Sequence, residues 1–207
     1  MLLARSMSGK LRKFFKALLW IQSGFPTPAP DFVKHKVLMR HGRSDAWIET
    51  GTYLGDTTKF LSKSSKIVYS LEPSQNLYLD AERRFQASPI IRIVKGTSEE
   101  KLREVINLII PLGFKHISFW LDGHYSAGNT YQGPNDTPVI IELEIISEYL
   151  NSSLDLTIFI DDVRCFNSNL LEYASYPSLD LLVNWCRSNH MSWSIEHDIL
   201  IIKNKIS

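Results

Sequence analysis

Residues 47–58 read WIETGTYLGDTT, an apolar strand that ends in an acid, passes through a glycine turn and enters a helix. Glycine at positions 51 and 55 lets the backbone approach a ligand that a side chain would block. A second apolar segment ends in Glu72, and a carboxylate at the tip of a strand suits a ribose diol. Together the two features predict a nucleoside-containing cofactor on a twisted α/β sheet.

Apolar segments that predict strands alternate along the chain with segments that predict helices. This alternation is typical of a parallel sheet with helices on both faces. Thr97 followed by Glu100 predicts a capping box at the start of one helix. Strands are expected at 46–50, 66–72, 90–95, 116–122 and 156–161, and helices from about 56 and at 75–86, 98–109, 137–150 and 177–190.

The end of the chain breaks the alternation. Residues 192–196 and 199–202 read as two strands joined by a tight turn at His197 and Asp198, and no helix fits between them. We therefore expect an α/β, Rossmann-like and mostly parallel sheet that closes with an antiparallel hairpin. That ending is unusual for a dinucleotide dehydrogenase.

Length and composition narrow the class of protein. A chain of 207 residues is long enough for one domain with a substantial core. A net charge of +1 gives no global field that favours nucleic acid, so no nucleic-acid partner is expected. Cys165 and Cys186 make no disulfide framework, and a reduced, cytoplasmic setting fits best.

Residues 1–30 form a separate segment, a basic amphipathic helix followed by a proline-rich linker. Its apolar run at 14–21 is shorter than the ~20 residues of a membrane span and lacks a secretory cleavage site. The favoured interpretation is a helix that packs on the domain or on a partner, such as a second copy in a homo-oligomer. The alternative is peripheral membrane contact through residues 10–21.

The order of these elements resembles that of the class I S-adenosylmethionine-dependent methyltransferases. More narrowly, residues 45–204 resemble the small metal-dependent O-methyltransferases of the catechol type and of the macrolide and aminocoumarin sugar type. The resemblance implies a seven-stranded sheet, a methyltransferase domain at 31–207 and S-adenosyl-L-methionine as cofactor. Residues 49–55 stand where that family has E-x-G-x-Y-x-G. The implied cofactor residues are Glu49, Gly51, Thr52, Tyr53, Gly55, Thr57, Glu72, Gly96, Ser98 and Asp122.

A second group of polar residues is acidic. Asp122 follows the fourth predicted strand, and Asp161 and Asp162 follow the fifth. Neighbouring strands lie roughly 5 Å apart, and clustered carboxylates repel unless a cation compensates them. Hard oxygen ligands suit Mg²⁺ or another divalent cation, and the resembled family holds its metal at these positions. A metal-held hydroxyl would lose its proton to His124, which departs from the family pattern.

The sequence thus predicts an enzyme that methylates a hydroxyl oxygen of a small-molecule acceptor, a sugar, a phenol or a natural product, with metal assistance. Asp122 and His124 are its candidate catalytic residues, and the polar loop 125–136 is a candidate lid. Three alternatives stay open: a metal-independent N-, C- or O-methyltransferase, a non-catalytic nucleotide-binding protein, and a nucleotide-dependent oxidoreductase or sugar-modifying enzyme.

Overall fold

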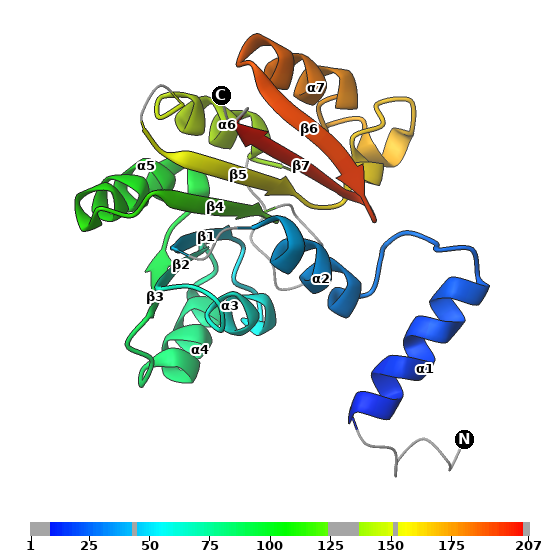
Figure 1. The fold of residues 1–207 in the computed structure, drawn as a ribbon, viewed down its shortest axis with the longest axis horizontal. Coiled ribbons are helices and arrows are strands. Elements are labelled where there is room, and N and C mark those ends of the chain that lie inside the picture. The colour runs from blue at the N-terminus through cyan, green and yellow to red at the C-terminus, as the bar shows by residue number, and fades with distance from the viewer. Residues whose placement is uncertain (1–8, 43–44, 124–136, 151–152, 205–207) are drawn as a thin grey trace.

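The computed structural model describes residues 9–42, 45–123, 137–150 and 153–204. Within them, seven strands form one sheet with the order β3-β2-β1-β4-β5-β7-β6 (Figure 1). The first five strands are parallel, and β7 runs antiparallel to both β5 and β6. The predicted fold class is confirmed. The strands are β1 (Ala46–Thr50), β2 (Ile67–Glu72), β3 (Ile91–Lys95), β4 (His116–Leu121), β5 (Asp155–Ile160), β6 (Met191–Glu196) and β7 (Ile199–Asn204).

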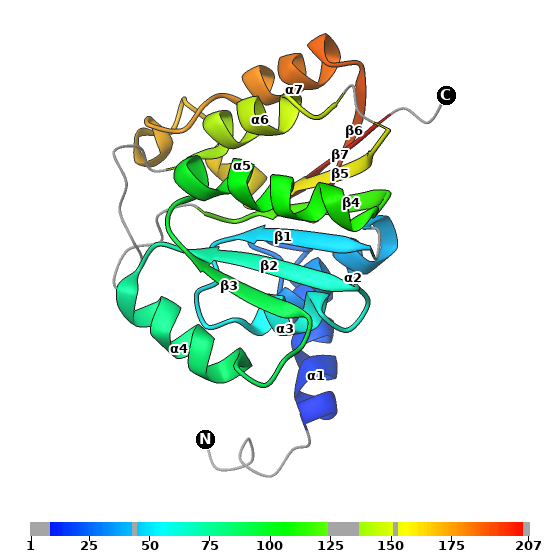
Figure 2. The same ribbon diagram turned by 90° about the vertical axis from the view of Figure 1, so that its left-hand side faces the viewer.

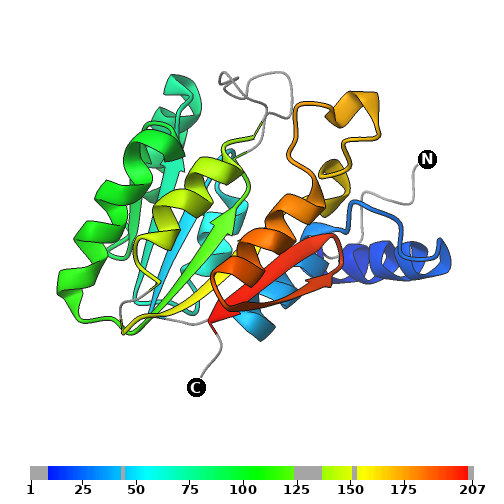
Figure 3. The same ribbon diagram turned by 90° about the horizontal axis from the view of Figure 1, so that it is seen from above.

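Helices cover both faces of the sheet. Three of them, α5, α6 and α7, lie side by side on one face, and α2, α3 and α4 lie on the other (Figures 2 and 3). The helices are α1 (Gly9–Gln22), α2 (Asp31–His41), α3 (Asp56–Leu61), α4 (Gln75–Phe85), α5 (Ser98–Ile109), α6 (Val139–Ser147) and α7 (Leu179–Ser188). Short 3₁₀ turns occur at η2 (Ile110–Leu112), η3 (Val163–Cys165) and η4 (Leu171–Tyr173).

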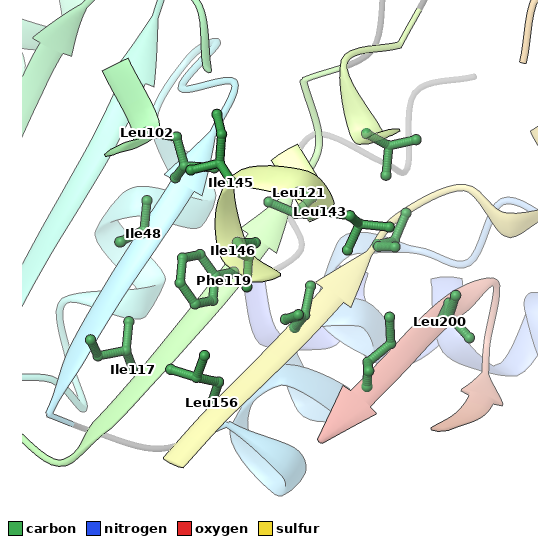
Figure 4. Close-up of a cluster of buried hydrophobic side chains, with 14 of the residues drawn as sticks. Ile48, Leu102, Ile117, Phe119, Leu121, Leu143, Ile145, Ile146, Leu156 and Leu200 are labelled. Carbon is green, nitrogen blue, oxygen red and sulfur yellow. The ribbon is translucent and has the colours of Figure 1, made fainter. Parts of the chain in front are cut away.

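The core has two parts because successive side chains of a strand point to opposite faces. On the α5–α6 face, Ile48 and Phe119 pack with Leu102, Leu143 and Ile146 (Figure 4). On the α2–α4 face lies a second cluster, which includes Val37, Leu38, Trp47, Trp120 and Phe159. The central strands are therefore apolar on both sides, as buried parallel strands usually are.

Helix ends differ from the prediction more than helix centres do. The predicted buried face of α5 (Leu102, Val105, Ile106 and Ile109) is confirmed. The predicted capping box is wrong, because Thr97 stands at the N-cap of α5 without a side-chain cap hydrogen bond. The spacing of apolar residues therefore predicted this helix correctly, whereas no side-chain cap fixes the residue at which the helix begins.

The N-terminal helix α1 stands apart from the sheet (Figure 1). Residues 23–30 connect it to α2, and this linker folds back on the end of α1, where the Phe25 N–H donates to the Trp20 carbonyl at 3.1 Å. Trp20 Nε1 donates to the Pro26 carbonyl at 2.7 Å, and the Trp20 ring meets the His197 ring edge-on at 5.2 Å. The C-terminal end of α1 thus contacts the β6–β7 turn. None of the described helices is long and apolar enough to cross a membrane.

Candidate functional site

The carboxyl ends of the five parallel strands meet at one edge of the sheet. The strand order changes direction between β1 and β4, because β2 and β3 lie on one side of this boundary and β5 on the other. In open α/β sheets, ligands bind outside the carboxyl ends of the strands at such a switch point. The segments predicted to bind the cofactor, after β1, β2, β3 and β4, all begin at this edge.

The loop after β1 passes directly against the end of β4. Gly51 has φ +90°, and a Cβ atom there would lie 2.7 Å from the Asp122 carbonyl oxygen. The Asp122 N–H donates to the Thr50 carbonyl at 3.2 Å. Gly55 has φ +77°, and a Cβ atom there would lie 2.6 Å from the Phe85 ring. Both glycines are therefore required by the protein's own packing, whatever ligand the loop accepts.

Glu72 fastens this loop to the end of β2. One carboxylate oxygen accepts the Tyr53 N–H at 2.9 Å, and the other accepts the Ser74 N–H at 2.9 Å. Burial raises the pKa of Glu72, and these backbone hydrogen bonds oppose the rise. A carboxylate has about four acceptor sites, and the Thr52 N–H also acts on this group, so Glu72 keeps capacity for one hydroxyl donor.

Glu49 is fully buried below the same loop. Its Oε2 accepts both the Thr58 and the Ser70 hydroxyls at 2.5 Å. Its Oε1 has no hydrogen-bond partner among the described residues. Burial raises the pKa of Glu49 to about 8, so the carboxyl group holds a proton at neutral pH. A cationic donor beside Oε1 would satisfy this atom and favour ionisation.

The other predicted cofactor residues occupy the same edge. Gly96 has φ +140°, and its N–H donates to the Glu72 carbonyl at 3.2 Å. Ser98 is buried as the first residue of α5. Thr52 Oγ1 lies 2.6 Å from Ser70 Oγ, and Thr57 Oγ1 lies 3.4 Å from His35 Nε2. His124 and the predicted lid at 125–136 lie outside the described residues.

Basic side chains pair with the acidic residues that follow β5. Lys34 of α2 places Nζ 2.5 Å from Asp161 Oδ2 and 3.1 Å from Asp162 Oδ1. Arg164 donates to Asp162 Oδ1 at 2.6 Å and also pairs with Asp198. Burial would lower the pKa of Lys34, but the charges of Asp161 and Asp162 outweigh it and raise this pKa. Lys34 is therefore charged.

This pairing gives no support to the interpretation of Asp122, Asp161 and Asp162 as ligands of Mg²⁺, which stays a prediction. The compensating charge that the sequence analysis assigned to a metal comes from Lys34 and Arg164. Across residues 9–42, 45–123, 137–150 and 153–204, no three His, Cys, Asp or Glu side chains are grouped so that they could hold a metal ion. The donor set therefore does not fit Mg²⁺ in this arrangement.

Two residues of the site were not predicted. Lys34 gave no signal, because its partner Asp161 is 127 positions away. Glu142 did give one, because it lies on the apolar face of α6 with Val139 and Ile146. Glu142 is fully buried, its Oε1 lacks a partner within the described part of the chain, and burial raises its pKa to about 7. Glu142 and Asp161 line the same small cavity.

Comparison with known proteins addresses the fold. No protein-family model matches the chain, and no curated protein sequence matches it. A candidate S-adenosylmethionine-dependent methyltransferase from Listeria monocytogenes superposes with a TM-score of 0.53 at 10% identity, covering 83% of this chain and 95% of that chain. A candidate methyltransferase from Streptococcus mutans in complex with S-adenosylhomocysteine superposes with a TM-score of 0.50 at 16% identity, covering 85% of this chain and 98% of that one.

This chain has the class I methyltransferase fold. A precorrin 8w decarboxylase from Methanobacterium thermoautotrophicum is also similar, with a TM-score of 0.51 at 14% identity, covering 87% of this chain and 93% of that chain. At these identities the likeness shows the fold alone. The neighbours do not point to the metal-dependent O-methyltransferase branch.

Proposed function

We propose that this protein is an S-adenosylmethionine-dependent methyltransferase that methylates a hydroxyl oxygen of a small molecule. One observation carries the proposal. Two carboxyl groups at the ends of the adjacent strands β1 and β2, those of Glu49 and Glu72, flank a single loop, and both have unused acceptor capacity. A ligand with an ammonium group at one end and a ribose diol at the other matches that pair.

The residues would share the cofactor as follows. Glu49 Oε1 would accept a hydrogen bond from the ammonium group of its methionine part, and Glu72 would accept one from a ribose hydroxyl. Gly96 and Ser98 would lie along its adenine, and the backbone of 51–55 would pass beneath it. The cofactor supplies a methyl group on a sulfonium. The chain contributes binding and alignment, which account for much of the barrier reduction when two reactants must meet in line.

Lys34 is the candidate group that positions the acceptor. Its ammonium has three N–H donors, and Asp161 and Asp162 take two of them. The third would donate to the acceptor oxygen and stabilise the negative charge that develops as its proton leaves. Asp122, at the end of β4, and His124 remain the candidates to receive that proton.

The metal-assisted form of the reaction is less well supported. Mg²⁺ at Asp161 and Asp162 would have to displace Lys34 from both carboxylates, which would leave a mostly buried ammonium without its two partners. We therefore assign no step to a metal. A metal-independent reaction, the alternative already open from the sequence, fits these contacts.

Calorimetric titration with S-adenosylhomocysteine tests the proposal. Wild-type protein should bind it, and Glu72→Gln should weaken binding about tenfold or more, because an amide nitrogen would face a backbone N–H and lose a ribose acceptor. Glu144→Gln, an exposed glutamate on α6, is the matched control and should leave affinity unchanged. Absence of binding to the wild-type protein would overturn the proposal.

The acceptor is tested separately. Incubation with S-adenosylmethionine and a mixture of sugars and phenols, read by mass spectrometry, should show methylated product that disappears with Lys34→Met. Binding of S-adenosylhomocysteine without any methyl transfer would favour the non-catalytic alternative.

A further inference from the structure

Large apolar side chains on α1 are exposed to solvent. Phe14, Phe15, Leu18, Leu19 and Ile21 are 58%, 48%, 38%, 63% and 48% exposed. Spacings of three, four and seven residues place these side chains on one side of the helix. They do not pack on the sheet, since α1 projects away from it (Figure 1). An apolar stripe of this kind on a protein surface usually marks an interaction site.

The charged residues of this segment are all basic. The sequence of α1 contains Lys10, Arg12, Lys13 and Lys16 and no acid, and the first acidic residue of the chain is Asp31. With Arg5 included, residues 1–30 carry five basic residues. The rest of the chain has 18 Lys and Arg against 22 Asp and Glu, so it is net negative. The partner that complements a basic helix with a bare apolar side is an anionic surface with an apolar interior.

The attachment of α1 places it beside the candidate site. Trp20 contacts His197 in the β6–β7 turn, and Asp198 of the same turn pairs with Arg164. Arg164 also pairs with Asp162 of the acidic cluster. The end of α1 and the functional edge of the sheet are thus linked through a few consecutive contacts. Whatever α1 binds is held on the side of the molecule where that edge lies.

We propose that α1 is an interfacial helix that binds the surface of anionic lipid membranes. Its apolar side enters the boundary between headgroups and acyl chains, while its basic residues meet the lipid phosphates. A second copy of the chain is a weaker partner, because a helix of 14 residues is only about 21 Å long and two of them bury less than a stable dimer needs.

Vesicle co-sedimentation of the full chain tests this proposal. The protein should sediment with vesicles made of equal parts phosphatidylcholine and phosphatidylglycerol, and it should remain in solution with phosphatidylcholine alone. The double variant Phe14→Ser/Leu18→Ser should lower the partition coefficient about a hundredfold. Lys16→Gln should lower it about fivefold, because each basic residue near an anionic surface adds a similar increment.

A matched control is available on α5 and η2. Leu108 and Leu112 are 50% and 49% exposed, and Leu108→Ser/Leu112→Ser should bind vesicles like the wild type. Equal loss of binding in both double variants, or no binding of the wild-type protein to anionic vesicles, would overturn the proposal. A second result would also overturn the proposal. If the wild-type protein does not bind vesicles but forms a dimer in analytical ultracentrifugation, and Phe14→Ser/Leu18→Ser dissociates that dimer, then α1 binds a second copy of the chain.

Discussion

Lys34 Nζ lies 2.5 Å from Asp161 Oδ2, although 127 positions separate the two residues in the chain. The contact fastens α2, which precedes the first strand, to the end of β5 at the carboxyl edge of the sheet. The two side chains are only 14% and 3% exposed. An ion pair this deeply buried affects stability more than a surface ion pair does, because removing one partner leaves the other charge buried and uncompensated.

Replacing Lys34 with Met should therefore lower the free energy of unfolding by about 3 kcal/mol or more, measured by urea denaturation. Lys36→Met, at an exposed position of the same helix, should change it by less than about 0.5 kcal/mol. Adding Asp161→Asn to Lys34→Met should recover part of the loss. Equal effects of the two single lysine substitutions would contradict the buried pairing.

Gly51→Ala should destabilise the protein by about 2 kcal/mol or more, because φ is +90° and the new Cβ would meet the Asp122 carbonyl. Gly113→Ala is the control, with φ +73° but no atom within 4 Å of the new Cβ. It should cost only about 1 kcal/mol. Thermal unfolding of both variants checks the difference, and similar melting temperatures would show that the approach of β1 to β4 is not tight.

Glu49 should make stability fall as the pH rises. Its pKa is raised from 4.5 to about 8 on folding, so between those two values the unfolded chain releases a proton that the folded protein keeps. Stability from this group is complete below about pH 4.5 and is lost through about pH 8. Glu49→Gln should flatten this part of the curve of unfolding free energy against pH. An unchanged slope would place the pKa of Glu49 near its ordinary value.

A chelator should leave both S-adenosylhomocysteine affinity and methyl transfer unchanged, because Lys34 and Arg164 already compensate Asp161 and Asp162. The measurement is turnover and titration after dialysis against EDTA, with and without added Mg²⁺. If EDTA removes the activity and Mg²⁺ restores it, the acidic cluster binds a metal ion that the reaction needs.

The sheet could be predicted because its strands are buried on both faces. Runs such as 46–48 and 158–160 are apolar without interruption, and an acidic residue or a glycine that follows each such run marked the carboxyl end of the strand. The closing hairpin was visible because His197 and Asp198 leave no room for a helix. Helix ends were less predictable, since Thr97 stands at its N-cap position without making the hydrogen bond that its residue type suggests.

The candidate site was predictable only in part. Residues that follow strands, such as Glu72 and Asp122, can be placed at one edge from topology alone. Lys34 could not be placed at this edge, because it does not follow a strand. Whether a side chain on a covering helix reaches the edge depends on how the helix packs on the sheet, and the sequence pattern does not reveal that packing. Without knowledge of Lys34, three clustered carboxylates predicted a metal cation, whereas the structure places the cationic side chains of Lys34 and Arg164 beside two of them.

Glu49 and Glu142 share one property, a pKa raised by burial to about 8 and about 7. Alkaline conditions therefore oppose folding at the very edge where ligands would bind. Glutamine at these two positions would give a more stable protein at alkaline pH, and the activity lost with them would measure how much stability the protein gives up for its function.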